Sequence, residues 1–196
     1  MPTKRCRTTA LCTGTALIVA GGKGGQNNHD LKLVEVMNIE TCQWSTVADL
    51  PKPMLCAPAA VCGHQIYILT SSNMYTCSGS ALIQSRRSTV TAVLWKRVAA
   101  LPVMDTTCVS IHGRLLAIGG RDSKHNPTTA IHMYNPTTNS WEVISHMTTP
   151  RRSCYAAILP NNQLIVVGGD TGGYLNTDSV ELATVCLLYT SDAADE

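Results

Sequence analysis

A pair of glycines that closes a short apolar run recurs along this chain and limits its possible folds more than any other feature. The three pairs are Gly21-Gly22, Gly119-Gly120 and Gly168-Gly169. The first glycines of the last two pairs are 49 residues apart, and those of the first two are 98 apart, which is twice that step. The spacing predicts a fourth copy near residue 70, where the apolar run 66–69 ends in Thr70-Ser71. The chain therefore consists of four units of one repeat, and one unit has lost its glycines.

Each unit is predicted to form four short strands. In the third unit, residues 107–112, 114–118, 130–134 and 140–144 are strand-like segments separated by turn residues. Four strands joined by three turns form an antiparallel meander, and no segment shows a sustained helical period. The run before each glycine pair is apolar on both faces, so we expect it to be buried between neighbouring sheets. A lone sheet of this kind cannot cover both faces, so the units must stack on one another.

Large residues recur near the end of the first three units. Trp44, Trp95 and Trp141 are in the predicted fourth strands, and Tyr134 precedes Trp141 by seven residues, as Met37 precedes Trp44. Glycine pairs followed by such residues at this period resemble the kelch motif, which builds the blades of a β-propeller. The resemblance covers residues 2–185 and implies an all-β kelch β-propeller fragment with three full four-stranded blades and a truncated fourth. We expect blades at about 2–50, 51–102, 103–150 and 151–185, which look like part of a larger ring.

The second unit departs from the pattern. Thr70-Ser71 is followed almost at once by Met74-Tyr75, so the loop after its second strand is predicted to be short. Tyr75 and Trp95 are 20 residues apart, whereas the corresponding separation in the other units is 7. The next turn is therefore predicted to contain a polar and flexible insertion at residues 78–93.

The last eleven residues leave the repeat pattern. Residues 186–196 resemble the translation of an adapter used in sequencing libraries, so we treat them as a non-native tail and exclude them from fold reasoning. Without the three acidic residues of this tail, the net charge becomes about +5 instead of +2.

Composition narrows the function classes. Nine cysteines occur without a Cys-x-x-Cys motif or a neighbouring histidine pair, so we expect reduced thiols, no metal site and no cofactor. The first residues lack the apolar core of a secretory signal, and no apolar run approaches the roughly 18 residues that span a membrane, so we expect a cytoplasmic protein. The modest charge and an aromatic content of 5% without phenylalanine do not favour nucleic-acid binding.

The resemblance also suggests where a partner binds. In a propeller, the segment that crosses to a blade and the loop after that blade's second strand open on one face, where functional loops belong. BTB-kelch ubiquitin-ligase adaptors bind acidic peptides on this face with arginines, whose planar fork suits carboxylates. The matching candidates in this chain are Arg5, Arg7, Asn27, Arg121, Lys124, Arg151, Arg152 and Asp170. The alternative is that these are ordinary solvated loop charges. The second and third units carry no basic residues at the matching crossing positions, so such a face would be lopsided.

Enzyme signatures are weak. Residues 21–25 fit neither a Walker loop nor a dinucleotide fingerprint, and no helix is predicted after them. Cys154 and Tyr155 are adjacent on a strand and point to opposite faces, which excludes the crosslinked pair of kelch-like copper oxidases for these two residues. Asp178 and Glu181 are interpreted as exposed charges at a strand end. We therefore predict a non-enzymatic protein-interaction module with a protein or peptide partner, and the arginines favour an acidic one. The alternative is a fragment of a propeller enzyme of the sugar-oxidase or sugar-isomerase type with its active residues in missing blades.

Overall fold

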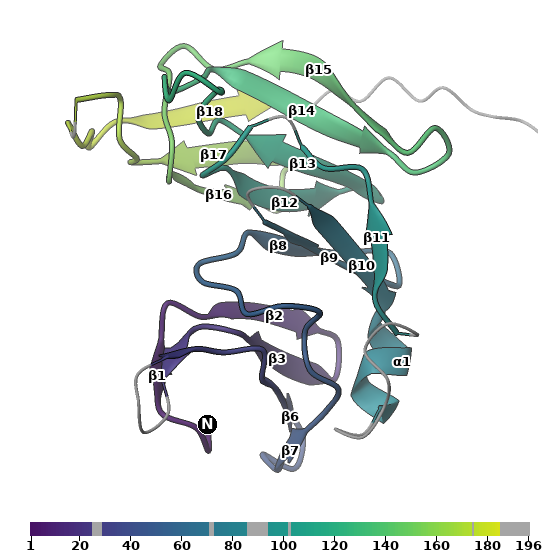
Figure 1. The fold of residues 1–196 in the computed structure, drawn as a ribbon. Helices are drawn as coiled ribbons and strands as arrows, with labels where there is room; N and C mark the ends of the chain where they lie inside the picture. The colour runs from purple at the N-terminus through teal and green to yellow at the C-terminus, as the bar shows by residue number, and fades with distance from the viewer. Residues whose placement is uncertain (25–28, 71–72, 86–93, 102, 174, 185–196) are drawn as a thin grey trace, which may run out of the picture.

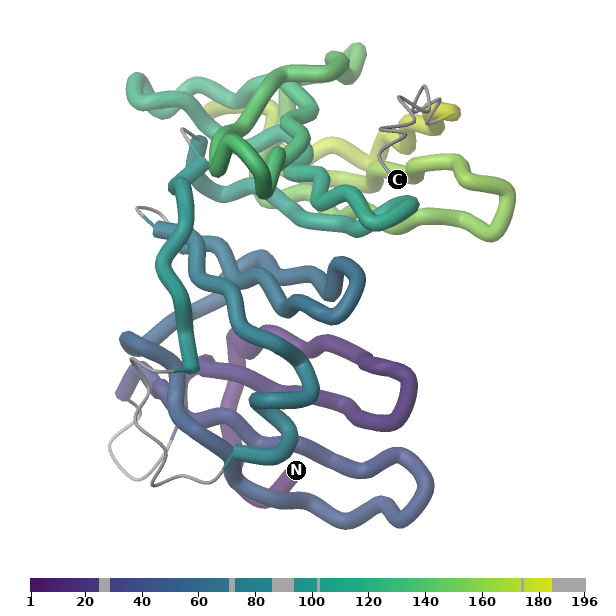
Figure 2. The backbone as a smooth tube through the Cα atoms, turned by 90° about the vertical axis from the view of Figure 1, so that its right-hand side faces the viewer, coloured from purple at the N-terminus to yellow at the C-terminus, as the bar shows by residue number. Residues whose placement is uncertain are grey.

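The chain folds into a stack of antiparallel sheets that follow one another in sequence order (Figure 1). The structure is a computed structural model, and it describes residues 1–24, 29–70, 73–85, 94–101, 103–173 and 175–184. Four of the five sheets in the described residues are blades, each built from one repeat unit. The first strands of successive blades lie side by side in both views (Figures 1 and 2). Among the described residues, no helix is long and apolar enough to cross a membrane.

The strands have the following bounds. Blade one contains β2 (Thr9–Thr13), β3 (Ala16–Ala20), β6 (Val34–Asn38) and β7 (Trp44–Thr46). Blade two contains β8 (Ala59–Cys62), β9 (Gln65–Leu69), β10 (Met74–Ser78) and β11 (Lys96–Val98). Blade three contains β12 (Thr107–Ile111), β13 (Arg114–Ile118), β14 (Ala130–Asn135) and β15 (Ser140–His146). Blade four contains β16 (Tyr155–Ile158), β17 (Gln163–Val167) and β18 (Val180–Thr184). The predicted all-β fold, with three four-stranded sheets and a fourth that is shorter, is confirmed.

Apolar cores fill the spaces between blades. The side chains of a strand alternate between two faces, so each blade has a front face toward the next blade and a back face toward the previous one. Ile18 on the front of blade one packs in one core with Ile66 and Ile68 on the back of blade two. Similar cores join blade two to blade three and blade three to blade four. The second strand of each of the first three blades is largely buried, as its two-sided apolar pattern predicts.

The glycine pairs let backbones approach where one blade meets the next. Gly21 has φ +65, and a Cβ placed on it would lie 2.5 Å from the carbonyl oxygen of Met54, so a side chain there would clash. The N–H of Gly22 donates a hydrogen bond of 2.8 Å to that same oxygen. In blade three, the N–H of Gly120 donates to Arg151 O at 2.9 Å. The segment that crosses to the next blade is thus anchored on the glycine pair of the previous one.

Blade two contains the departures that its sequence predicts, and one that it does not. β9 and β10 are joined by a short loop in which Thr70 N donates to Asn73 O at 2.8 Å. A helix, α1 (Gly79–Gln84), occupies the start of the insertion, so the prediction of no helical segment is wrong here. Its N-cap is Ser78, and its buried Leu82 joins the core between blades one and two. This apolar anchor explains how so short a helix is held. The rest of the predicted flexible insertion, residues 86–93, lies outside the described residues, as does the tail 186–196.

In blades one, three and four, a short ladder joins the crossing segment to the loop after the second strand. In blade one, β1 (Arg5–Cys6), β4 (Lys23–Gly24) and β5 (His29–Asp30) form a small sheet in which Cys6 pairs with Lys23. Met104 pairs with Arg121 in blade three, and Arg152 pairs with Asp170 in blade four. These pairs make Arg5 and Arg151 equivalent positions of the repeat, one residue before the paired position.

Candidate functional site: a pocket between the inner strands

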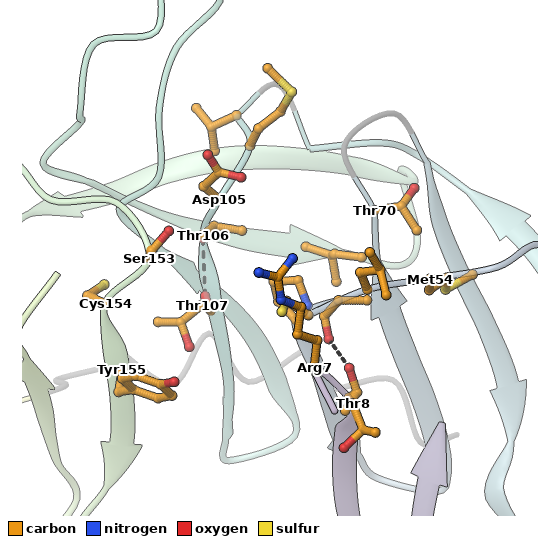
Figure 3. A pocket seen from close by; sticks show the side chains of 18 of the residues that line it. Arg7, Thr8, Met54, Thr70, Asp105, Thr106, Thr107, Ser153, Cys154 and Tyr155 are labelled. Carbon is orange, nitrogen blue, oxygen red and sulfur yellow. Dashed lines mark hydrogen bonds between the residues drawn. The ribbon is translucent and has the colours of Figure 1, made fainter. Parts of the chain in front are cut away.

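The first strands of the four blades, β2, β8, β12 and β16, surround a pocket of about 880 Å³, called the inner pocket below (Figure 3). Residues at the start of these strands and in the crossing segments line it. The volume falls within the roughly 300–1,000 Å³ of ligand-binding pockets. All four blades contribute residues to the lining, so the pocket exists only because the repeats stack around it.

The same backbone conformation recurs at the pocket wall in every blade. Arg7, Cys56, Asp105 and Ser153 occupy equivalent positions, two residues after the Arg5 and Arg151 positions, and have φ values of 54, 46, 55 and 51. The N–H of Cys56 donates to Arg7 O at 2.9 Å, and the N–H of Ser153 donates to Asp105 O at 2.7 Å. A left-handed conformation costs a non-glycine residue about 1–3 kcal/mol and is concentrated at functional sites. Its recurrence at the pocket wall supports this pocket as the candidate site.

Arg7 and Lys52 supply the positive charge of the pocket lining, and the acidic Asp105 in the same lining pairs with Arg121. The guanidinium of Arg7 projects into the space between the inner strands (Figure 3), and among the described residues it forms no ion pair. Hydroxyl groups dominate the polar lining around it, from Thr8, Thr9, Thr70, Thr106, Thr107, Ser153 and Tyr155. Cationic side chains among hydroxyl groups favour an anionic group with further hydrogen-bond acceptors.

Ion pairs neutralise the predicted basic residues at the rim. Arg121 Nε lies 2.6 Å from Oδ2 of Asp105, and its Nη1 also contacts Nδ1 of His125. Arg152 donates to Oδ2 of Asp170 from Nη2 at 2.7 Å and from Nε at 3.1 Å. The hydrogen bond from Arg152 lowers the pKa of the Asp170 carboxyl below its usual value. Arg152 and Asp170, both predicted as binding residues, therefore bind each other.

Arg5 and Arg151 lie inside the protein, which corrects their interpretation as exposed binding residues. Both side chains have 0% exposed surface. Arg5 donates to Gly21 O at 3.0 Å and to Leu33 O at 2.9 Å, and it forms an ion pair with Glu35. Each guanidinium binds within its own blade, and neither presents a surface to a partner. Neither guanidinium is therefore accessible from the surface.

Arg151 makes the corresponding contacts in blade four. It donates to Gly168 O at 2.8 Å, to Ser179 O at 3.1 Å and to Oε1 of Glu181 at 2.7 Å. Buried charges of this kind are stable only when they are paired and hydrogen-bonded. The two arginines are therefore structural residues that tie a crossing segment to the third strand of its blade.

The position of Glu181 also differs from the prediction of an exposed strand-end charge. Its carboxylate accepts hydrogen bonds from the N–H groups of Thr148 at 2.8 Å and Thr149 at 3.0 Å, besides the bond from Arg151. Burial acts to raise the pKa of Glu181, but these hydrogen bonds outweigh it and lower the pKa to about 2. Asp178, which had the same interpretation, is exposed.

The remaining residues singled out from the sequence lie outside the inner pocket lining, in its wall, or outside the described residues. Asn27 lies outside the described residues. Lys124 is exposed in the loop that Asp122 stabilises through its carboxylate, away from the inner pocket lining. Cys154 is buried and Tyr155 is exposed, so they point to opposite faces as the strand alternation predicts. The aromatic markers Tyr134 and Trp141 pack together with ring centroids 5.2 Å apart.

Sequence reasoning missed most of the pocket. Cys56, Ser153 and the threonines that line it are small polar residues without a distinctive motif. A signal for them was present: Cys56 and Ser153 occupy the repeat position of Arg7, and the lining threonines other than Thr70 follow within two residues of that position in their units. Comparing the units position by position, without a bias toward charged residues, would have found them.

Comparisons with known proteins agree with this architecture. A model of the KLHDC2/KLHL20/DRC7 Kelch-repeats domain matches residues 7–191. The chain belongs to the kelch-repeat family. This kelch chain is 27% identical over 184 residues to Kelch-like protein 25 of Xenopus tropicalis, covering 87% of the chain and 30% of that relative. It is 24% identical over 185 residues to human Kelch-like protein 38, covering 91% of the chain and 31% of that relative.

Its fold is also that of a solved structure. The structure of YjhT matches with a TM-score of 0.73 at 15% identity, over 96% of this kelch chain and 68% of that one. The chain spans about 30% of the length of the two curated Kelch-like relatives named above. Membership of the kelch-repeat family indicates a β-propeller module for protein binding.

Proposed function

We propose that this kelch chain is a non-enzymatic interaction module that binds an acidic side chain of a partner's peptide segment in the inner pocket, with Arg7 as its anchor. Charge pairing supports the proposal. Arg5, Arg121, Arg151 and Arg152 each pair with a carboxylate of the chain itself, whereas Arg7 forms no ion pair among the described residues. A guanidinium binds a carboxylate through two charge-assisted hydrogen bonds, and the neighbouring hydroxyls can donate more.

A charge reversal at Arg7 tests this function. A library of random 12-residue peptides displayed on phage is selected on the wild-type chain and on the Arg7→Glu variant. We expect Asp or Glu at one recurrent position in peptides selected by the wild type, and Lys or Arg at that position for Arg7→Glu, because the anchoring charge is inverted. Lys124→Glu is the matched control, since Lys124 is exposed outside the pocket. Selected peptides with no acidic preference, or with the same preference on both proteins, would refute the proposal.

The alternative function, a fragment of a sugar oxidase or sugar isomerase, stays a hypothesis. Among the described residues, no group of three or more His, Cys, Asp or Glu side chains could hold a metal ion. Elemental analysis of the purified protein decides the metal-dependent version, because stoichiometric copper or iron would favour an enzyme. We also propose a cytoplasmic location, since Cys6, Cys12, Cys42 and Cys56 are exposed free thiols that suit a reducing compartment.

A further inference from the structure

His132 on β14 is a buried polar residue at the junction between blades two and three. Its side chain is 6% exposed, and its Nδ1 has no hydrogen-bond partner among the described residues. Two residues further along the same face of β14, Tyr134 packs in the apolar core between these blades. Buried polar atoms in folded proteins almost always have a partner, so an unpaired imidazole in this core requires an explanation.

Two other blades hold a carboxylate at the same position of the repeat. His132 pairs with Ala117, two residues before the glycine pair, as Glu35 does in blade one and Glu181 in blade four. Each of these glutamates forms an ion pair with the arginine of its own crossing segment. Blade three therefore has an imidazole in place of a paired acidic group.

The arginine of that pair is also missing from blade three. Val103 lies one residue before Met104, which pairs with Arg121, so Val103 holds the repeat position of Arg5 and Arg151. A valine side chain can neither donate a hydrogen bond nor carry a charge. The imidazole thus lies where blades one and four hold an ion pair, and neither member of the pair is present.

A second histidine shares the face of His132. His146 on β15 pairs with Ala130, two residues before His132, and its Nδ1 lies 3.1 Å from Oγ1 of Thr129. Burial lowers the pKa of His132, and the charge of His146 lowers it further. The pairing of β14 with β15 shifts register beside His132, and such a bulge disrupts the ladder locally.

The other titratable groups of this junction offer no counter-charge. Strand alternation places the following on the two facing surfaces: Cys62, Tyr67 and Lys96 of blade two, and Cys108, Tyr134 and His146 of blade three. The crossing segment 99–104 adds none among its described residues, and Asp105 after it pairs with Arg121. A proton on His132 would therefore bury a positive charge without a carboxylate to pair with it, which is costly.

We propose that the junction between blades two and three is an acid switch, in which a proton on His132 beside His146 opens the contact between these blades while the other two junctions stay closed. The blades at those junctions carry Tyr75 and Glu181 at the position of His132. A tyrosine takes up no proton at acid pH, and Glu181 stays ionised and paired because its pKa is about 2. Histidine is the side chain whose charge ordinarily changes between pH 5 and 8.

The pKa of His132 sets the direction and the range of the switch. Because this pKa lies below the ordinary value of 6.5 in the closed junction, the open junction binds the proton more tightly. The closed form is therefore fully favoured above pH 6.5 and loses stability as the pH falls below that value. One proton changes the opening equilibrium by at most about tenfold for each pH unit.

Each junction contains its own cysteine, which makes the junctions separately measurable. Cys77 lies in the core between blades one and two, Cys154 in the core between blades three and four, and Cys108 beside Ala117 at the junction of His132. The full chain is treated at pH 7.5 and at pH 5.5 with 4,4′-dithiodipyridine, a disulfide that modifies thiols at acid pH. Mass spectrometry gives the rate at each cysteine, which is divided by the rate of glutathione at the same pH. We expect the corrected rate of Cys108 to rise about three- to tenfold at pH 5.5 and the other two rates to stay unchanged.

Variants separate the switch from ordinary core packing. In His132→Gln, which is neutral at both pH values, the rise at Cys108 should disappear. The double variant Val103→Arg/His132→Glu builds the ion pair of blades one and four, and it should also keep the corrected rate of Cys108 constant. His64→Gln is the matched control, because His64 is an exposed histidine, and this variant should behave like the wild type.

Several outcomes overturn the proposal. They are a constant corrected rate of Cys108 in the wild type, an equal rise at Cys77 and Cys154, and a rise at Cys108 that persists in His132→Gln. Circular dichroism confirms that each variant is folded. If His132→Gln is not, His146→Gln replaces it: without the neighbouring charge the rise at Cys108 should be smaller, and a rise as large as in the wild type would contradict the switch.

Discussion

Replacing Glu181 by glutamine would leave the buried guanidinium of Arg151 without its counter-charge. Oε1 of Glu181 accepts from Arg151 Nη2 at 2.7 Å and from Thr149 N at 3.0 Å, and Oε2 accepts from Thr148 N at 2.8 Å. Glutamine has nearly the same side-chain volume as glutamate but only one acceptor oxygen. Its amide NH₂ would face N–H donors of Arg151 or of the two threonines. The variant therefore separates the charge of this site from its packing.

The lowered pKa of Glu181 sets the magnitude. A pKa of about 2 in the folded chain, against an ordinary value of 4.5, corresponds to about 3 kcal/mol of stabilisation at neutral pH. The side chain is 19% exposed, so solvent screening lowers our expectation to about 2 kcal/mol. Because the folded pKa lies below the unfolded one, this contribution is complete above pH 4.5 and disappears as the pH falls toward 2.

Urea unfolding followed by tryptophan fluorescence at several pH values measures this contribution. We expect Glu181→Gln to lower the free energy of unfolding by about 2 kcal/mol at pH 7, and the difference from wild type to shrink steadily between pH 4.5 and pH 2. Asp178→Asn is the matched control, because Asp178 is an exposed acidic residue nearby, and its effect should stay within about 0.5 kcal/mol. A Glu181→Gln variant as stable as wild type at pH 7, or a difference unchanged at pH 2, would refute the reasoning.

Two further predictions follow from the glycine pairs and the buried thiols. Gly21→Ala should destabilise the chain more than Gly168→Ala in thermal unfolding: both need a positive φ, which costs about 1–2 kcal/mol, but only the first also places a Cβ 2.5 Å from Met54 O. Equal losses would argue against the close contact between Gly21 and Met54 O. Burial raises the pKa of the Cys77 thiol to about 12. A thiol-reactive dye at pH 8 should therefore label the exposed Cys56 in the native chain and label Cys77 only after unfolding, with the labelled sites mapped by mass spectrometry. Fast labelling of Cys77 in the native chain would contradict its burial.

The repeat could be predicted from the sequence because its main constraints are local. A positive φ at Gly21 or Gly119 is a property of one residue, and strand alternation needs only a few neighbours. A fixed period then repeats the same local signal, so the drifted second unit could be placed by spacing alone. The helix α1 escaped prediction because its six residues depend on one buried contact, that of Leu82, and are too short to show a helical period.

The arginines could not be assigned from local sequence. Arg5 and Arg7 are two residues apart on one crossing segment, yet one lies inside the blade and the other in the inner pocket. The difference arises because Glu35, some 30 residues later on the third strand, forms an ion pair with Arg5 inside the blade. Acidic residues at matching repeat positions, Glu35 and Glu181, were the available sign that the arginines before those blades are internal.

The pairing of most of these arginines within the chain limits the binding specificity of the propeller face on which the inner pocket opens. Five arginines facing solvent would attract any strongly acidic segment and would lose affinity steeply as salt is added. Four of them pair with carboxylates of the chain, which leaves Arg7, together with Lys52, as the cationic part of the inner pocket, within a wall of hydroxyl groups. Under the proposed function, recognition depends on placing one carboxylate with hydrogen-bond acceptors around it, which favours shape over total charge. The buried pairs contribute in a different way: by tying each crossing segment to its blade, they hold the left-handed residues two positions later, Arg7 and Ser153, at the pocket wall.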